Sequence, residues 1–376
     1  MKAILRVTAA LAMLAASVPA LAASAKVTRG WQFKPESNAG LTVRNLMGDV
    51  RVERGTAAGI HVTVTTTIEA ESEAEAKRLA TLVDYRTSDV GAGSRLDVRL
   101  PRGHFPKLYW ENGASSWFSL SYVEHLGERI RLVGDRYDAP SVRVDLVIRA
   151  PAGAKLEVDN TFGSAVARGY SGKLRLDGGS GLLSSTSGEG ELELDNGSGE
   201  VVVSGHRGRV SADTGSGAVK ITGCECEIEA DTGSGSVDIE DGKGSVAADT
   251  GSGSVDVVGF AGDFVADTGS GAVRAQRLSA VRRLAVDTGS GSVAVEGDLS
   301  ALTHVAIDTG SGDVSLRSSA QPSLELRIDA GSGGVDVSAP GSTIRRTEDA
   351  TIVRMKDGAG SGVIDTGSGR VEIDFQ

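Results

Sequence analysis

One short motif recurs along the C-terminal part of this 376-residue chain, and the interval between its copies sets the length of a structural repeat. The string Asp-Thr-Gly-Ser-Gly occurs seven times, with its Asp at positions 213, 231, 249, 267, 287, 308 and 365. Related strings begin at Asp159, Asp177, Asp195 and Asp329. From Asp159 to Asp267 the copies follow at a constant interval of about 18 residues, and the interval then widens slightly as far as Asp329. A regular period of this length is typical of a repeat protein, in which each unit packs on the next.

Each repeat contains two strand signals. After Gly-Ser-Gly, apolar and polar residues alternate, as in Val219 and Ile221, and a second alternating segment such as Val210 and Ala212 leads to the next Asp. Alternation with a period of two predicts strands with one buried face. The sequence therefore predicts an all-β fold, a parallel β-solenoid with two strands in each coil of about 18 to 21 residues. A right-handed coil is favoured.

Glycine marks the corners of these coils. The chain has 51 glycines, about twice ordinary usage, and 40 of them follow residue 150. Glycine is the residue that adopts a positive φ without steric cost, as tight corners require. We therefore expect the solenoid to occupy residues 151–376.

The repeated Asp permits three interpretations. Asp-Thr-Gly-Ser is the catalytic string of aspartic proteases, but those enzymes need two converging carboxylates, and seven copies in a row at the coil spacing argue against that geometry. Calcium is a second interpretation, with Asp213, Asp231, Asp249 and Asp267 as weak candidate ligands. The third is structural: each Asp accepts backbone N–H groups in an Asx turn, while Thr and Ser hydroxyls hydrogen-bond along the stack. This third interpretation is the favoured one.

The two cysteines lie inside the repeat array, at Cys224 and Cys226. Alignment of successive repeats places Cys226 where other coils have Gly208 and Gly244. A local disulfide, two free thiols and a soft-metal site are all compatible with this spacing. Export favours the disulfide.

The segment 1–22 predicts export. Lys2 and Arg6 precede an apolar run that ends in Ala20-Leu21-Ala22, the pattern of a secretory signal peptide with its cleavage site. The mature chain has no apolar run long enough to span a membrane. We expect the protein in the periplasm, at the cell surface or outside the cell.

Residues 26–150 differ from the repeats. They combine alternating strand segments with an amphipathic helix at 72–85, which a capping box of Ser72 and Glu75 begins. An insertion at 104–137 is rich in aromatic residues. It is interpreted either as a hairpin packed on the solenoid or as an exposed patch for a partner, glycan or membrane surface. The partner-binding candidates are Phe105, Tyr109, Trp110, Trp117, Phe118 and Tyr122.

The order of segments resembles a known family. The strand-rich GDVRVERG at 48–55 is followed by RAPAGAKLEVDNTFGSAV at 149–166 and then by the GSG-x-V-x-I coils. This order resembles the bacterial putative adhesin family over residues 40–376, a domain of unknown function related to auto-transporter adhesin head domains. The resemblance implies a β-solenoid fold and has no established catalytic residues to carry over.

The sequence favours an exported, non-enzymatic solenoid that acts as an adhesin-like or cell-envelope scaffold. A net charge of −11 argues against nucleic acid as a partner, so an envelope component, a surface protein or a glycan is expected. We expect no catalytic residue and no cofactor. The alternatives are a β-helix that binds or cleaves carbohydrate, and a repeat roll stabilised by Ca²⁺.

Overall fold

The computed structural model describes residues 23–33, 40–56, 58–91, 93–109, 122–133 and 139–376. The chain forms two compact units, Met1–Leu182 and Leu183–Gln376. The predicted signal peptide at 1–22 lies outside the described residues. No helix in the described part is long and apolar enough to cross a membrane.

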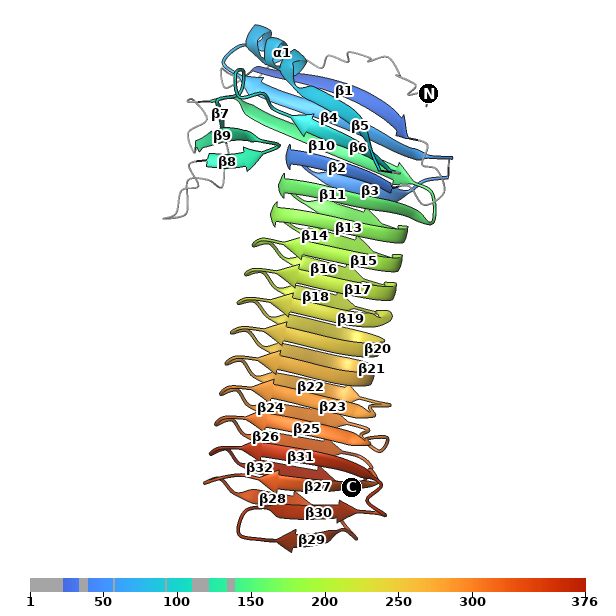
Figure 1. Ribbon diagram of the computed structural model, residues 1–376, viewed down its shortest axis with the longest axis vertical. Coiled ribbons are helices and arrows are strands. Elements are labelled where there is room, and N and C mark those ends of the chain that lie inside the picture. The colour runs from blue at the N-terminus through green and yellow to red at the C-terminus, as the bar shows by residue number, and fades with distance from the viewer. Residues whose placement is uncertain (1–22, 34–39, 57, 92, 110–121, 134–138) are drawn as a thin grey trace. The chain divides into compact units, whose positions relative to one another are not determined.

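The first unit contains one helix, α1 (Glu73–Leu82), two large families of paired strands and a small sheet of order β7, β9, β8 (Figure 1). Its strands are β1 (Ala23–Phe33), β2 (Gly40–Met47), β3 (Val50–Arg54), β4 (Ile60–Ala70), β5 (Asp84–Val90), β6 (Gly93–Arg99), β7 (Lys107–Tyr109), β8 (Tyr122–His125), β9 (Glu128–Val133), β10 (Ser141–Ala150), β11 (Ala154–Phe162), β12 (Ala165–Arg168) and β13 (Ser171–Ser180). One family pairs in the order β1, β4, β10, β3, β12, and the other in the order β5, β6, β2, β11, β13.

The coiled arrangement begins earlier than the repeat motif indicates. Strands β2 and β3 pair in parallel with β11 and β12, so they form a coil although residues 55–153 separate them in sequence. Gly48 and Gly163 stack here, since a Cβ on Gly163 would lie 2.2 Å from the Gly48 carbonyl oxygen. The composition changes at residue 150, whereas the first compact unit ends at Leu182.

The predicted helix is present and slightly shorter than the sequence suggests. The Ser72 side chain accepts a hydrogen bond from the Glu75 backbone N–H at 3.2 Å, which confirms Ser72 as the N-cap. Ala76, Leu79 and Ala80 are buried, and the helix contacts β1 and β4. Its apolar face therefore covers the antiparallel pair β1–β4.

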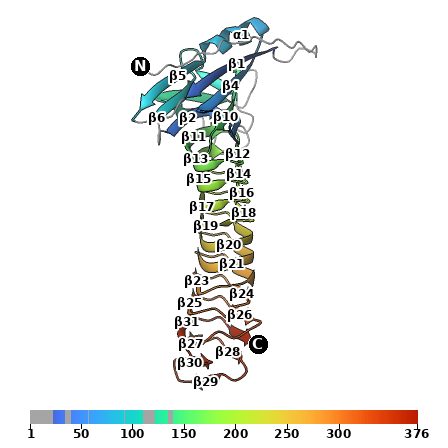
Figure 2. The ribbon, with the colours of Figure 1, turned by 90° about the vertical axis from the view of Figure 1, so that its right-hand side faces the viewer.

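The second unit is the β-solenoid that the repeat predicts (Figure 2). Its strands are β14 (Leu183–Thr186), β15 (Glu189–Asn196), β16 (Val201–Ser204), β17 (Arg207–Thr214), β18 (Val219–Thr222), β19 (Glu225–Thr232), β20 (Val237–Thr250), β21 (Val255–Thr268), β22 (Val273–Leu278), β23 (Arg283–Thr288), β24 (Val293–Gly297), β25 (His304–Thr309), β26 (Val314–Ser318), β27 (Leu324–Asp329), β28 (Val335–Ser338), β29 (Thr343–Arg346), β30 (Thr351–Met355), β31 (Gly360–Thr366) and β32 (Val371–Phe375).

These strands form two facing rows of parallel pairs. Row one contains β15, β17, β19, the second parts of β20 and β21, β23, β25, β31 and β27. Row two contains β14, β16, β18, the first parts of β20 and β21, β22, β24, β26, β32 and β28. The alternating residues of both rows point inward, and Val219, Ile221 and Val210 are fully buried.

The C-terminal coil does not occupy the last place in the stack. Strand β31 lies between β25 and β27, and β32 lies between β26 and β28. The final coil is thus inserted between two coils that precede it in sequence. The hairpin of β29 and β30 follows, with β30 antiparallel to β27.

Candidate functional site

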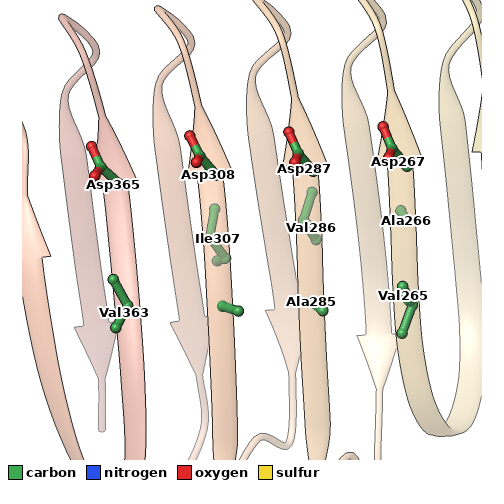
Figure 3. Close-up of a pocket in the computed structure, with 11 residues that line it drawn as sticks. Val265, Ala266, Asp267, Ala285, Val286, Asp287, Ile307, Asp308, Val363 and Asp365 are labelled. Atoms are coloured by element: carbon green, nitrogen blue, oxygen red, sulfur yellow. The ribbon is translucent and has the colours of Figure 1, made fainter.

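The seven exact Asp-Thr-Gly-Ser-Gly copies form a continuous row on one face of the second unit. Their Asp residues are direct partners in neighbouring strands, in the order 213, 231, 249, 267, 287, 308 and 365. Strand spacing of about 4.8 Å separates neighbouring copies. All seven side chains are exposed, and Figure 3 shows four of them pointing to the same side.

The threonine of each copy, and not the aspartate, makes the side-chain hydrogen bonds of the turn. Each Thr of the seven copies is buried, and its hydroxyl donates to a glycine carbonyl of the coil before it at 3.0–3.1 Å. The same oxygen accepts a backbone N–H three residues on at 2.9–3.2 Å. The predicted hydroxyl hydrogen bonds along the stack are therefore confirmed for the threonines.

The Asx-turn interpretation was wrong for these copies. In the described part of the chain, none of the seven carboxylates has a hydrogen bond or an ion pair. The degenerate copy at Asp329 shows the reason, because Ala330 replaces the threonine there and Asp329 accepts from the Gly331 N–H at 3.1 Å. Where the threonine hydroxyl is present, the Asp carboxylate is exposed to solvent.

This division of roles predicts opposite outcomes for neighbouring substitutions. Thr268→Val leaves the Gly271 N–H and the Gly253 carbonyl without a side-chain partner, so the free energy of unfolding should fall by about 1–3 kcal/mol. Asp267→Asn should leave it unchanged or slightly raised. Chemical denaturation measures both, with Thr268→Ser as the control that retains the hydroxyl. A larger loss in Asp267→Asn than in Thr268→Val would refute this assignment.

Neighbouring carboxylates in the row repel one another. Burial, followed by the neighbouring carboxylates, raises the pKa values of Asp213, Asp249, Asp267 and Asp308. Residues 183–376 carry 31 Asp and Glu against 15 Lys and Arg, a net charge of −16. Residues 1–182 carry 24 Lys and Arg against 19 acidic residues, a net charge of +5. The acidic character of the chain is therefore concentrated in the unit with the row.

A column of small apolar side chains runs beside the carboxylates. Val265, Ala285, Ala306 and Val363 are direct partners in row one, and the side chain of Val363 is 51% exposed. With Asp267, Asp287, Asp308 and Asp365 they line a shallow groove of about 400 Å³ (Figure 3). In these four coils the face thus offers a repeating pair of chemistries, one aliphatic contact and one carboxylate.

The predicted calcium ligands lie in this row but in separate coils. Asp213, Asp231, Asp249 and Asp267 each occupy one strand of row one. In the described part of the chain, no group of three or more His, Cys, Asp or Glu side chains could hold a metal ion. A Ca²⁺ ion takes six to eight oxygen ligands, so calcium remains a prediction for solution measurement.

The two cysteines form a disulfide at a corner of the solenoid. Cys224 is bonded to Cys226, with a Cα–Cα distance of 5.5 Å, and both side chains are buried. Cys226 pairs with Gly208 and Gly244, as the alignment of successive repeats predicts. The bond therefore closes a local corner and lies away from the groove.

The aromatic candidates are only partly assembled on a surface. Phe105 is fully buried, so its place in an exposed patch was wrong. It lies just before β7, which forms a small sheet with β9 and β8. Tyr109 is half-buried, and Tyr122 is 44% exposed with the Arg129 guanidinium 4.4 Å from its ring centroid. Trp110, Trp117 and Phe118 lie outside the described residues.

A second carboxylate, that of Asp159 in the first unit, should make the stability of the fold depend on pH. Burial raises the pKa of Asp159 to about 6, and Asp177 and Glu157 add to the shift. The folded state then holds the proton more tightly than the unfolded state, so stability falls as pH rises from about 4 to about 6. Asp159→Asn should raise stability at pH 7.5 by about 1 kcal/mol, a value reduced for solvent screening. Melting temperatures at pH 4.5 and 7.5 test this, and an equal gain at both pH values would contradict it.

Comparisons with known proteins give little about function. No protein-family model and no curated protein matches this chain. Among solved structures, a putative cell adhesion protein from Clostridium sporogenes ATCC 15579 aligns over 93% of this chain and 99% of its own length. The identity is 10% and the TM-score 0.21. At this TM-score the likeness says nothing about the activity of this chain.

Proposed function

We propose that this protein is an exported, non-enzymatic β-solenoid that acts as an adhesin-like or cell-envelope binding scaffold. The observation that carries the proposal is the row of seven carboxylates that the fold does not use, beside a column of small apolar side chains. Such a face suits an extended partner with a repeating structure, because the four coils of the groove offer the same contact at the same spacing.

Export is supported by two independent features. The segment 1–22 has the pattern of a signal peptide, and a Cys224–Cys226 disulfide fits an oxidising compartment. The periplasm and the cell surface are both compatible with these features. The resemblance to the bacterial putative adhesin family agrees with either location.

A non-enzymatic role is supported by the chemistry of the groove. Catalysis by carboxylates requires two groups with different pKa values that converge on one bond. The groove instead repeats an Asp and an aliphatic side chain from coil to coil. We therefore assign the face to binding, through many weak and equivalent contacts.

Binding to immobilised cell-envelope fractions and to a glycan array tests this proposal. The test variant combines Asp287→Asn, Asp308→Asn and Asp365→Asn in the groove. The control combines Glu240→Gln, Glu296→Gln and Asp374→Asn, which lie in row two and remove the same charge. We expect salt-sensitive binding that weakens at least tenfold in the test variant alone. Equal binding by both variants, or release of reducing sugar ends from a bound glycan, would overturn the proposal.

Calcium is a second candidate for the same row, because a divalent cation would relieve the repulsion between neighbouring carboxylates, which after burial raises the pKa values of Asp213 and Asp267. A bound ion stabilises the folded state in proportion to the logarithm of its concentration over its dissociation constant. The calcium proposal therefore expects a higher melting temperature in excess Ca²⁺ than in a chelator, and expects the groove variant to lose that difference. Equal melting temperatures for the native chain would exclude it.

A further inference from the structure

At the C-terminal end of the solenoid the two rows end at different levels, and we call the resulting ledge, formed by β28, β30 and β29, the step. Row one continues past β27 with β30 and then β29, whereas row two ends at β28 (Figure 2). Row one therefore extends two strands beyond row two. In the described part of the chain, β28 pairs on one side only, with β32, and β29 pairs only with β30.

Core residues are incompletely covered at this step. Val335 and Val337 of β28 occupy the inward positions of row two and are half-buried, whereas their partners Val371 and Ile373 are 0% and 1% exposed. Ile344 of β29 is 43% exposed, although its direct partner Val353 is fully buried. Val335, Val337 and Ile344 thus leave apolar surface open where further strands of row two would lie, with Arg346 at the other inward position of β29.

The two free edges run in opposite directions. Each coil is closed, so the chain crosses row two in the direction opposite to row one. Strand β29 follows the direction of β27, because two successive antiparallel pairings separate them. It therefore runs opposite to β28. A two-fold axis parallel to the strands keeps the direction of every strand, and it would bring β29 of one copy antiparallel to β28 of the other.

We propose that this step is a self-association surface through which two copies of the chain join end to end. The two-strand overhang of each copy fills the two-strand step of the other, and both rows continue across the joint. This contact is isologous, since the same patch serves on both sides and closes at a dimer. It pairs both free edges, which otherwise remain templates for aggregation.

Charge favours a second copy as the occupant. On the outward face, Asp336 of β28 comes beside Arg345 of the partner copy's β29, a cross-strand pair of opposite sign. Residues 335–358 carry four acidic and four basic side chains, while the whole unit has a net charge of −16. The step is therefore a place where two such acidic units meet without strong repulsion.

Sedimentation velocity of the full chain, from low to high micromolar concentration, tests the proposal. We expect a species of twice the chain mass, and Ile344→Lys or Val337→Lys should weaken the dimer at least tenfold. Both side chains are partly exposed, so both variants should fold. Val363→Lys is the control, because that side chain is similarly exposed but lies on the groove face.

A charge exchange separates this joint from other modes of association. Asp336→Arg alone should weaken the dimer, and the double variant Asp336→Arg with Arg345→Asp should restore it. A native chain that stays monomeric at all concentrations would overturn the proposal. So would a dimer that Ile344→Lys leaves intact, or a double variant that dimerises no better than Asp336→Arg.

Discussion

Deleting residues 360–376 is expected to unfold two coils and not one. The deleted segment contains β31 and β32, which are the parallel partners of β27 and β28. Without it, β27 keeps only β30 as a partner and β28 keeps none. Four fully buried apolar side chains are lost, namely Ile364, Val371, Ile373 and Phe375, at roughly 1.5–3 kcal/mol each. Residues 324–355 should therefore unfold as well, and lose their protection from hydrogen exchange and from proteases.

Hydrogen exchange and limited proteolysis of the deletion variant measure directly whether residues 324–355 are folded. We expect fast exchange in Leu324–Asp329 and Val335–Ser338, and a protease-resistant fragment that ends near Ser318. Ile373→Asp keeps the chain length and should produce the same pattern through a single buried charge. A resistant fragment that still includes residues 324–355 would show that the coils stack in sequence order.

Gly271→Ala is expected to cause the largest loss of stability for a single methyl group. A Cβ at this position would lie 1.6 Å from the Gly253 carbonyl oxygen of the coil before it. Both groups belong to the main chain of paired coils, so the clash can be relieved only by separating the coils. We expect a loss of about 3–5 kcal/mol in the free energy of unfolding, beyond the usual cost of overpacking.

The control is a glycine with open space around it. Gly334 follows the degenerate repeat, and a Cβ there would meet no atom within 4 Å. Gly334→Ala should change stability by no more than about 0.5 kcal/mol. Urea denaturation of the two variants compares them, and similar losses would mean that the coils are not stacked this closely.

The solenoid could be predicted because its signals are local. Alternation such as Val219 with Ile221, together with the constant interval between copies of the motif, specifies strands and their partners without knowledge of distant contacts. One coil was missed although its signal was present: Gly48, Val50 and Val52 fit the same G-x-V-x-V pattern as the repeats. The long insertion that follows obscured its relation to β11 and β12.

The order of the last coils could not be predicted in the same way. Residues 360–376 have the same alternation as any other coil, so their pattern fits every place in the stack. Their position depends on which neighbours the connecting hairpin β29–β30 leaves available. The roles within the motif had a signal that could have been used. Thr214 continues the inward alternation of Val210 and Ala212, which places the adjacent Asp213 on the outward face.

The central claim is that the repeated threonines build the corners and leave the repeated aspartates for a partner. The melting temperature of a chain in which all seven Asp of the exact copies are changed to Asn tests it most directly. We predict a folded solenoid that melts at the same temperature as the native chain or higher at pH 7, since repulsion along the row is removed. A variant that fails to fold, or that melts well below the native chain, would contradict it.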